Sequence, residues 1–258
     1  MRILYEEVLD FFLWGLETFS RRDCGLILAG YRVTDSERRA NQMLDRLAQQ
    51  RLLKRVGRGQ DARFSITTDG QQRTAVAEPT PSWNRRWDGQ WRVVGYDLPE
   101  TRRKDRLVLW QALRARKLGL LQRSMWVWPH DLEPILVDVI HAKGIPECFC
   151  GFEAHRLFLC NDAEVVLAAW DFEEISRRQH AYLKHLVANI SALKAAGTLV
   201  QLAHIARVER QAYQFAFSLD PLLPRSLCPK DYEGFAVEQR RQQFRDRLRR
   251  RCRDLRSS

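Results

Sequence analysis

Residues Trp87–Arg106, WDGQWRVVGYDLPETRRKDR, join a short apolar run to a single carboxylate, a proline and a cluster of arginines. The apolar run, Trp91–Tyr96, has the length and the aromatic and β-branched content of a strand. The chain after the first arginine, Arg103–Leu118, carries apolar residues at helical spacing. The stretch therefore predicts a strand that ends at Asp97 and is followed closely by a helix.

The same alternation continues towards the C-terminus. Leu120–Trp128 indicates a pair of strands, and Leu132–Ala142 indicates a second helix. Two further strands are expected at Glu147–Phe152 and Leu157–Cys160. Strand, helix, strands, helix and strand is the order of a ferredoxin-like domain, so we expect such a domain over residues 87–162.

The chain on either side of this domain has different signatures. Two prolines and small polar residues make residues 77–86 a linker, which sets off residues 1–76 as a domain of their own. Residues 163–258 have helical periodicity and end in an arginine-rich helix, so a helical C-terminal domain is expected. The fold class is therefore expected to be α+β.

The N-terminal segment predicts three helices and a hairpin. Helices are expected at Tyr5–Phe19, at Cys24–Gly30 and from near Asp35. Thr34 and Glu37 have the spacing of a capping box at the start of the third helix. Strand-like residues on both sides of the turn GRGQD, residues 57–61, predict the hairpin. This is the plan of a winged helix-turn-helix domain.

Positive charge is concentrated in parts of the chain. The whole sequence carries 43 Lys and Arg against 32 Asp and Glu, a net charge of +11. Residues 38–63 alone carry eight basic and two acidic residues, whereas residues 1–37 carry four basic and seven acidic ones. Arginine, asparagine and glutamine can pair with base edges, and arginine and lysine bind phosphates. The candidate DNA-binding residues are Arg38, Arg39, Asn41, Gln42 and Arg46 on the third helix, and Lys54, Arg55, Arg58 and Arg63 on the hairpin.

A solvated helix face beside an ordinary hairpin is the alternative interpretation of each half of this pattern. The two halves occur together, and the segment before them is acidic, so the combination favours a double-stranded DNA partner. We therefore expect the third helix to enter the major groove while the hairpin contacts phosphates.

Three separated blocks of the sequence resemble the PaaX-like family of transcriptional regulators, named after the repressor of phenylacetate catabolism. The blocks are TDSERRANQMLDRLAQQRLLKRVGRG at 34–59, WDGQWRVVGYDLPETRRKDRLVLWQALRARKLGLLQRSMWVWP at 87–129, and DPLLPRSLCPKDYEG at 220–234. The resemblance implies a homodimer and repression of transcription that a small effector relieves, an acyl-coenzyme A thioester in the namesake. The arrangement at Arg38–Arg39 and Asn41–Gln42 departs from the family's usual one, so the resemblance implies no particular operator sequence.

The middle domain also resembles the small metal-dependent subunit of the CRISPR integrase, in which an aspartate ending the first strand binds a divalent cation between two protomers. Asp97 is at the matching position, and Gln122 and Ser124 match a Gln-x-Ser segment of that protein. One carboxylate per chain is a poor site for Mg²⁺, which prefers octahedral oxygen ligands. In the other interpretation, Asp97 caps the following helix or pairs with Arg102 or Arg103. We therefore expect this fold without nuclease activity.

The remaining features are expected to be structural. The spacing of a zinc site is not found in Cys148, Cys150, His155 and Cys160. The six cysteines do not have the spacing of a disulfide framework, which indicates the reducing environment of the cytosol. The N-terminus is acidic where a signal peptide is basic, and no apolar run reaches membrane-spanning length. We expect a cytoplasmic protein without a cofactor or membrane contact.

The C-terminal segment, residues 240–258, contains nine arginines and two aspartates. Phe244, Leu248 and Leu255 form its apolar stripe. Either the helix docks by this stripe and leaves its arginines to contact phosphates, or it frays as a solvated tail. The sequence leaves both alternatives open.

The sequence thus predicts a sequence-specific DNA-binding transcriptional regulator, a repressor relieved by a small effector. Two other functions are kept as alternatives. One is a metal-dependent nuclease that uses Asp97, and the other is a DNA-binding accessory protein of a mobile or defence system.

Overall fold

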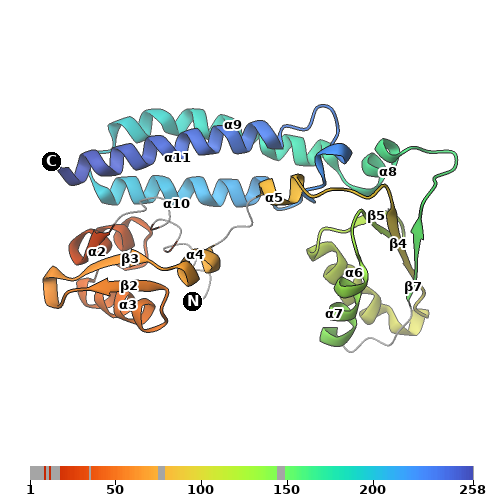
Figure 1. The fold of residues 1–258 in the computed structure, drawn as a ribbon, viewed down its shortest axis with the longest axis horizontal. Helices are drawn as coiled ribbons and strands as arrows, with labels where there is room; N and C mark the ends of the chain where they lie inside the picture. Colours follow the sequence, from red (N-terminus) through yellow and green to blue (C-terminus); the bar gives the residue numbers. More distant parts are fainter. Residues whose placement is uncertain are drawn as a thin grey trace. The chain divides into compact units, whose positions relative to one another are not determined.

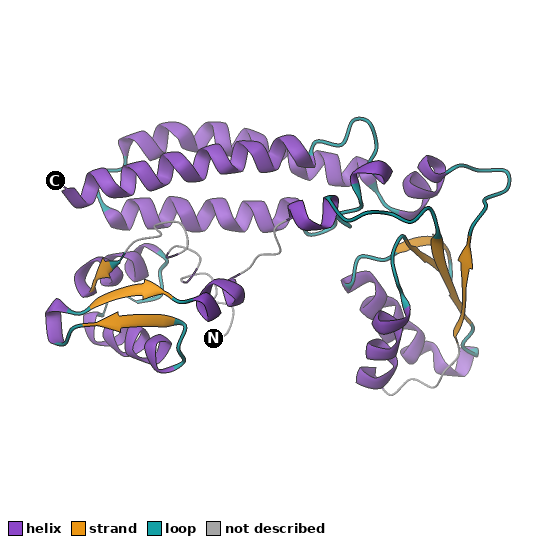
Figure 2. Ribbon diagram, viewed as in Figure 1, coloured by secondary structure: helices purple, strands orange, loops and turns teal. Residues whose placement is uncertain are grey.

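The structure is a computed structural model, and it describes residues 9, 12, 18–34, 36–74, 79–143 and 149–257 (Figure 1). The chain divides into two compact units. Unit 1 comprises residues 1–77, 178–216 and 234–258, and unit 2 comprises residues 78–177 and 217–233. Each unit contains one antiparallel sheet (Figure 2), and helices cover most of the remaining chain. The α+β fold class is therefore confirmed.

The N-terminal part of unit 1 is a small helical domain with a hairpin. Its elements are β1 (Phe19–Ser20), α2 (Arg21–Gly30), α3 (Glu37–Gln49), β2 (Leu53–Val56), the 3₁₀ turn η1 (Gly59–Asp61), β3 (Arg63–Ile66) and α4 (Thr68–Thr74). The strands pair in the order β1-β3-β2, all antiparallel. Of the helix expected at Tyr5–Phe19, Leu9 and Phe12 are helical and fully buried, and the other residues before Thr18 lie outside the described part.

Local capping sets where the helices of this domain begin. Ser20 and Asp23 form a capping box at the start of α2, because each side chain accepts a hydrogen bond from the other residue's backbone N–H. The capping box expected at Thr34 and Glu37 is wrong, since Ser36 is the N-cap residue of α3. The Thr34 hydroxyl instead accepts a hydrogen bond from the Ser36 N–H at 3.0 Å. Asp35, the expected helix start, lies outside the described residues.

Three long helices complete unit 1. They are the part of α9 (Phe172–Ala195) from residue 178 onward, α10 (Leu199–Ala216) and α11 (Gly234–Ser257). Helix α2 packs against α10 at Gly30, where an added Cβ would lie 2.5 Å from the Val200 carbonyl oxygen and 2.6 Å from the Ala203 Cβ. Because a side chain would separate the helices, glycine permits this close approach.

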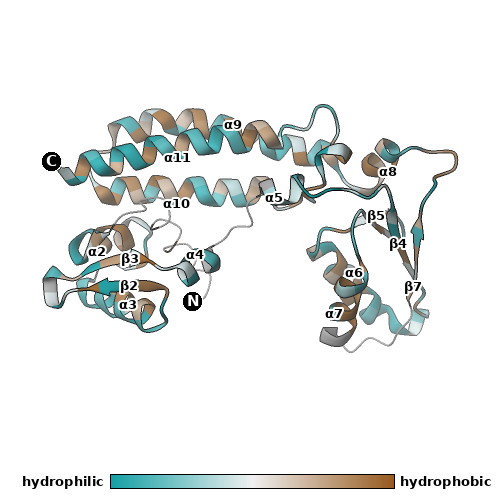
Figure 3. Cartoon of the chain, in the orientation of Figure 1, coloured by the Kyte–Doolittle hydropathy of each residue, from teal (hydrophilic) through white to brown (hydrophobic). Residues whose placement is uncertain are grey.

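The arginine-rich helix α11 is docked, although its residues are mostly hydrophilic (Figure 3). Phe244, Leu248 and Cys252 are buried along one side. Two hydrogen bonds from the Arg251 guanidinium, of 2.9 and 2.7 Å, satisfy the carbonyl of Ala196 just beyond the end of α9. Of the two alternatives for this segment, docking is therefore the one found.

A buried polar network links α9, α10 and α11. The Glu209 carboxylate forms an ion pair of 3.0 Å with Arg241 and accepts a hydrogen bond from the Tyr182 hydroxyl. Arg241 also lies over the ring of Tyr213, 3.6 Å from its centroid, and Tyr213 donates to Glu238 at 2.7 Å. Burial, and then the nearby Glu209 charge, raise the pKa of Tyr182 well above its usual range, so its hydroxyl remains a neutral donor.

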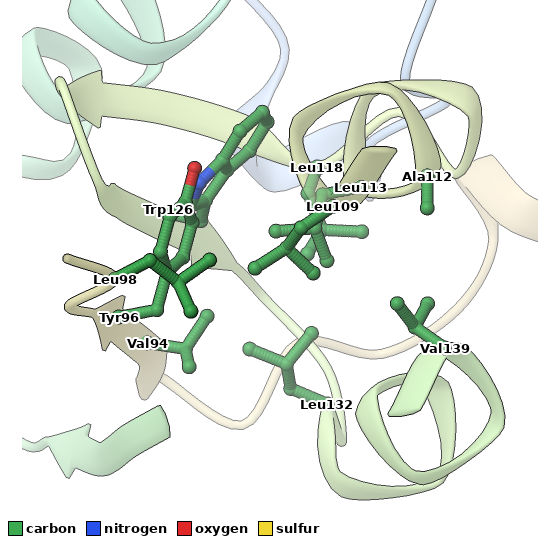
Figure 4. Packing of buried hydrophobic residues seen from close by; sticks show 10 residues of the cluster. All are labelled: Val94, Tyr96, Leu98, Leu109, Ala112, Leu113, Leu118, Trp126, Leu132 and Val139. Carbon is green, nitrogen blue, oxygen red and sulfur yellow. The ribbon is translucent and has the colours of Figure 1, made fainter. Parts of the chain in front are cut away.

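Unit 2 contains the expected ferredoxin-like domain. Its strands β4 (Trp91–Tyr96), β5 (Gly119–Gln122), β6 (Met125–Trp128) and β7 (Phe149–Ala154) pair in the order β5-β6-β4-β7. Helices α6 (Arg103–Ala115) and α7 (Glu133–Lys143) pack on one face of the sheet, and Figure 4 shows the core between them. The buried cluster consists of Val94, Tyr96, Leu98, Leu109, Ala112, Leu113, Leu118, Trp126, Leu132 and Val139.

The prediction of a strand at Leu157–Cys160 is wrong. Leu157–Cys160 is a loop, in which Leu159 has a φ of 61° and is fully exposed. An apolar pattern was not sufficient there, because a strand also needs a pairing edge, and none of the described strands pairs with this segment. The start of the strand expected from Glu147, up to Cys148, lies outside the described residues.

The remaining elements of unit 2 are α5 (Pro79–Trp83), the 3₁₀ turn η2 (Glu100–Arg102), α8 (Asp162–Ala169) and the 3₁₀ turn η3 (Arg225–Leu227). Part of the expected linker is thus helical, and Trp83 is buried, with its indole N–H donating to the Tyr232 hydroxyl at 3.2 Å. Each of the two units combines segments that are distant in sequence. The expected division into residues 1–76, 77–86, 87–162 and 163–258 stays a prediction. Among the described residues, no helix has the length and apolar content needed to cross a membrane.

Candidate nucleic-acid interface

The polar face of α3 is open to solvent within unit 1. Ala40, Met43, Leu44 and Leu47 are buried on one side of this helix. Helical periodicity therefore directs the intervening positions outward. The four outermost candidates, Arg38, Arg39, Gln42 and Arg46, are exposed, and Asn41 is half-buried.

The hairpin presents its basic residues in the same way. Lys54 and Arg55 lie on β2, Arg58 lies in the turn, and Arg63 begins β3, and all four are exposed. The turn between the strands needs glycine at Gly57, whose φ of 86° is in the left-handed region. All nine residues expected from the sequence therefore lie on the surface of one small domain, none of them fully buried.

Most of these side chains have no partner among the described residues. Arg38, Arg39, Gln42, Lys54, Arg58 and Arg63 form no side-chain hydrogen bond or ion pair with another described residue. Their charges and donors are therefore compensated by solvent alone within the described part of the chain. A surface of this kind can exchange water and counterions for a polyanion at low cost.

The Asp45 carboxylate pairs with Arg55. The Asp45 carboxylate lies 3.0 Å from the Arg55 guanidinium and 3.1 Å from that of Arg21, which is buried and lies over the Phe64 ring. This pair of contacts ties α3 to both α2 and β2. Arg55 thus has a structural contact that the sequence pattern did not indicate, and Arg21 and Asp45 fix the angle at which α3 is presented.

Asp97 lies at the end of β4, as expected, but the contacts expected for it are absent. The carboxylate is exposed and forms no hydrogen bond or ion pair with any described residue. Arg102 instead pairs with Asp105 at 2.5 Å, and α6 begins without a side-chain cap. The interpretation of Asp97 as a helix cap or an arginine partner is therefore wrong for the part of the chain that is described.

The other metal candidates are not gathered into a site. Cys150 and Cys160 are exposed free thiols, and Cys148 lies outside the described residues. Within the described ranges, no three His, Cys, Asp or Glu side chains are close enough to share a metal ion, and this includes the surroundings of Asp97.

Comparison with known proteins finds a family model that matches the middle domain. Residues 84–166 match the family model described as the PaaX protein central Cas2-like domain. The middle domain is similar to the central domain of PaaX proteins. The resemblance inferred from the sequence is thereby confirmed for the sheet of unit 2 and for helices α6 and α7, which lie within the matched residues.

A solved structure shares the fold over nearly the whole chain. It is the uncharacterized protein Rv0674 from Mycobacterium tuberculosis, with a TM-score of 0.58 and 20% sequence identity. The alignment covers 91% of this chain and 90% of that one. No curated protein matches the sequence.

The sheet of the middle domain has exposed apolar side chains. Phe152 on β7 is 53% exposed and Met125 on β6 is 37% exposed. In the register of the sheet, Phe152 pairs with Val93 and Met125 pairs with Gly95. Since side chains alternate along strands, both lie on the opposite face of the sheet from Val94 and the helices.

Proposed function

We propose that this protein is a sequence-specific DNA-binding transcriptional regulator that represses its target genes. The observation that carries the proposal is a set of exposed side chains on α3 and the β2–β3 hairpin that have no hydrogen bond or ion pair with another described residue: Arg38, Arg39, Gln42, Lys54, Arg58 and Arg63. The PaaX-type middle domain supports it, because the family's namesake is a transcriptional repressor. A protein of this kind acts on the chromosome, so the proposed location is the cytoplasm.

The order helix, turn, helix and hairpin supports a winged helix-turn-helix mode of binding. In this mode α3 lies in the major groove, where Gln42 and the arginines beside it reach base edges. Lys54, Arg58 and Arg63 hold phosphates from the hairpin, while Arg55 remains on Asp45. Base contacts select the sequence, and phosphate contacts supply affinity that is independent of sequence.

The proposal includes a homodimer and a small effector. Phe152 and Met125, two large apolar side chains exposed on the same face of the sheet, support dimerisation, because exposed apolar surface is typical of protein contacts. A groove of about 190 Å³ between α9 and α11 supports the effector. Its walls include Leu186, Ile190 and Phe244, and Arg240 at its edge suits an anionic group, as in an acyl-coenzyme A thioester.

Two alanine substitutions are expected to separate the roles of helix and hairpin. Gln42→Ala removes a side chain that can bond a base edge, so discrimination against wrong base pairs should fall by about 1–3 kcal/mol at one position of each half-site. Arg58→Ala removes a phosphate contact, so all duplexes should bind more weakly by a similar factor. Selection from a random duplex pool, followed by binding measurements at fixed salt, gives both quantities.

The selected sequences also test the dimer. Two half-sites about 10 base pairs apart are expected, because a two-fold symmetric protein reads successive turns of one groove.

Equal losses on every duplex from both Gln42→Ala and Arg58→Ala would contradict the assigned roles. Arg247→Ala is the control, since Arg247 is exposed on α11 and lies outside α3 and the hairpin.

The nuclease alternative is tested by a separate experiment. We propose that the chain has no metal-dependent nuclease activity, because Asp97 supplies a single carboxylate and belongs to no group of three His, Cys, Asp or Glu among the described residues. Labelled DNA and RNA incubated with the protein and Mg²⁺ or Mn²⁺ should remain intact. Cleavage by the natural sequence that Asp97→Ala abolishes would establish the nuclease instead.

A further inference from the structure

A polar cavity adjoins the proposed interface within unit 1. Its volume is about 550 Å³, and it lies where the start of α2, the start of β3, the α9–α10 turn and the end of α11 meet. The side chains that matter for its chemistry are Ser20, Arg22, Asp23, Arg63, Thr198 and Arg256. Four separate stretches of the chain therefore contribute to one cavity.

The cavity is positively charged. Its charged residues are Arg22, Asp23, Arg63 and Arg256, which carry three positive charges and one negative charge, a net of +2. Arg22 and Arg63 are exposed and form no side-chain hydrogen bond or ion pair with a described residue. Two arginine side chains in such a cavity suit a phosphate, because the planar guanidinium can donate two parallel hydrogen bonds to its oxygens.

Asp23, the carboxylate among the described residues that line the cavity, already has partners. Asp23 accepts a hydrogen bond from the Ser20 N–H at 3.3 Å and lies 3.6 Å from the Arg256 guanidinium. Arg256 also donates to the Thr18 carbonyl at 2.8 Å and lies 4.7 Å from the centroid of the Phe19 ring. Arg256 therefore neutralises Asp23 and fastens α11 to the first strand, which reduces the repulsion that Asp23 offers to an anion.

Two hydroxyl groups add donors. The Ser20 hydroxyl accepts a hydrogen bond from the Asp23 N–H at 3.1 Å, and the Thr198 hydroxyl accepts one from the Gln201 N–H at 3.2 Å. In both cases the oxygen acts as an acceptor, so its own proton remains able to donate. Hydroxyl and guanidinium donors are the usual partners of DNA phosphate oxygens.

We propose that this cavity receives a backbone phosphate of the duplex that α3 and the hairpin bind. The inference rests on the proposed function, and it extends the interface to the start of α2 and to the α9–α10 turn. Arg63 connects the two surfaces, because it belongs to the hairpin, pairs with Ser20 in the sheet and also lines the cavity. The C-terminal helices then take part in DNA binding through Thr198 and Arg256.

Arg22→Gln tests this inference in the full-length protein. The dissociation constant for a random-sequence duplex is measured over a series of NaCl concentrations. Each phosphate contact contributes about 0.9 to the slope of log affinity against log salt, so the variant should lose about that amount. The matched control is Arg247→Gln, which removes the same charge from an exposed position outside the cavity and should leave the slope unchanged.

Ethylation of individual phosphates locates the contact. One ethylated phosphate should weaken binding of the natural sequence and have no effect on Arg22→Gln. Thermal unfolding of the variant should match that of the natural sequence, since Arg22 is exposed and has no partner among the described residues.

Different results would contradict the cavity inference and the proposed function. If the natural sequence binds the duplex and Arg22→Gln keeps the same salt slope and the same ethylation pattern, the cavity is not a phosphate site and the helix-and-hairpin interface stands. If the natural sequence binds no duplex even at low salt, the proposed function fails and the cavity inference fails with it.

Discussion

Replacing Arg241 with alanine is expected to destabilise unit 1 by about 3–5 kcal/mol, because it leaves the buried Glu209 carboxylate without its counter-ion. The side chains of Arg241 and Glu209 are 5% and 0% exposed, so water cannot replace the lost partner. The substitution also removes the guanidinium from the ring of Tyr213. Urea unfolding gives the free energy, and hydrogen exchange of the α10 and α11 amides locates the effect in unit 1.

Arg240→Ala is the matched control for this prediction. Arg240 is the preceding residue on α11, is exposed and forms no ion pair or hydrogen bond with a described side chain. Its replacement should change the free energy of unfolding by about 0.5 kcal/mol or less. A loss from Arg241→Ala no larger than this control would show that the ion pair contributes nothing to stability.

A third variant separates a lost ion pair from a lost side chain. Tyr182→Phe, Glu209→Leu and Arg241→Met together replace the polar cluster with apolar groups of similar size. Since removing both charges avoids an unpaired buried ion, this variant should recover most of the stability that Arg241→Ala loses. If it is as unstable as the single variant, the cost comes from packing and not from the unpaired charge.

Removal of residues 240–258 is expected to unfold the helical part of unit 1. The deletion takes away the buried residues Arg241, Phe244, Arg245, Leu248 and Cys252. Replacing one buried phenylalanine by alanine costs about 3–5 kcal/mol, and a folded protein has only about 5–15 kcal/mol in total. Circular dichroism of the truncated chain should therefore show loss of helix beyond the deleted residues, and proteolysis should become fast in α9 and α10.

A charge-only variant distinguishes the structural role of this segment from its electrostatic role. Arg240, Arg247 and Arg250 are exposed, so changing all three to glutamine removes three charges while α11 stays docked. This variant should keep the far-ultraviolet spectrum and thermal midpoint of the natural sequence. A truncated chain that also keeps them would show that α11 is dispensable for the fold.

The local elements and the surface character of the candidate site follow from the residue pattern alone. Strand β4 was expected at Trp91–Tyr96, where the structure has it, because an apolar run of that composition favours a strand in most surroundings. The exposure of Arg38 and Gln42 was also predictable, since the apolar stripe of α3 fixes which side faces the core. Periodicity of this kind is a property of neighbouring residues.

Contacts between residues that are distant in sequence depend on how the elements pack. Nothing in the residue pattern indicates that Asp45 contacts both Arg21 and Arg55, or that Glu209 pairs with Arg241. These partners are separated by 10 to 32 residues and meet only after the helices pack. Leu157–Cys160 has a strand-like pattern and forms none, and α11 docks despite its charge. A pattern in the sequence specifies which side of an element is apolar, whereas pairing edges and charge partners depend on which elements share a core.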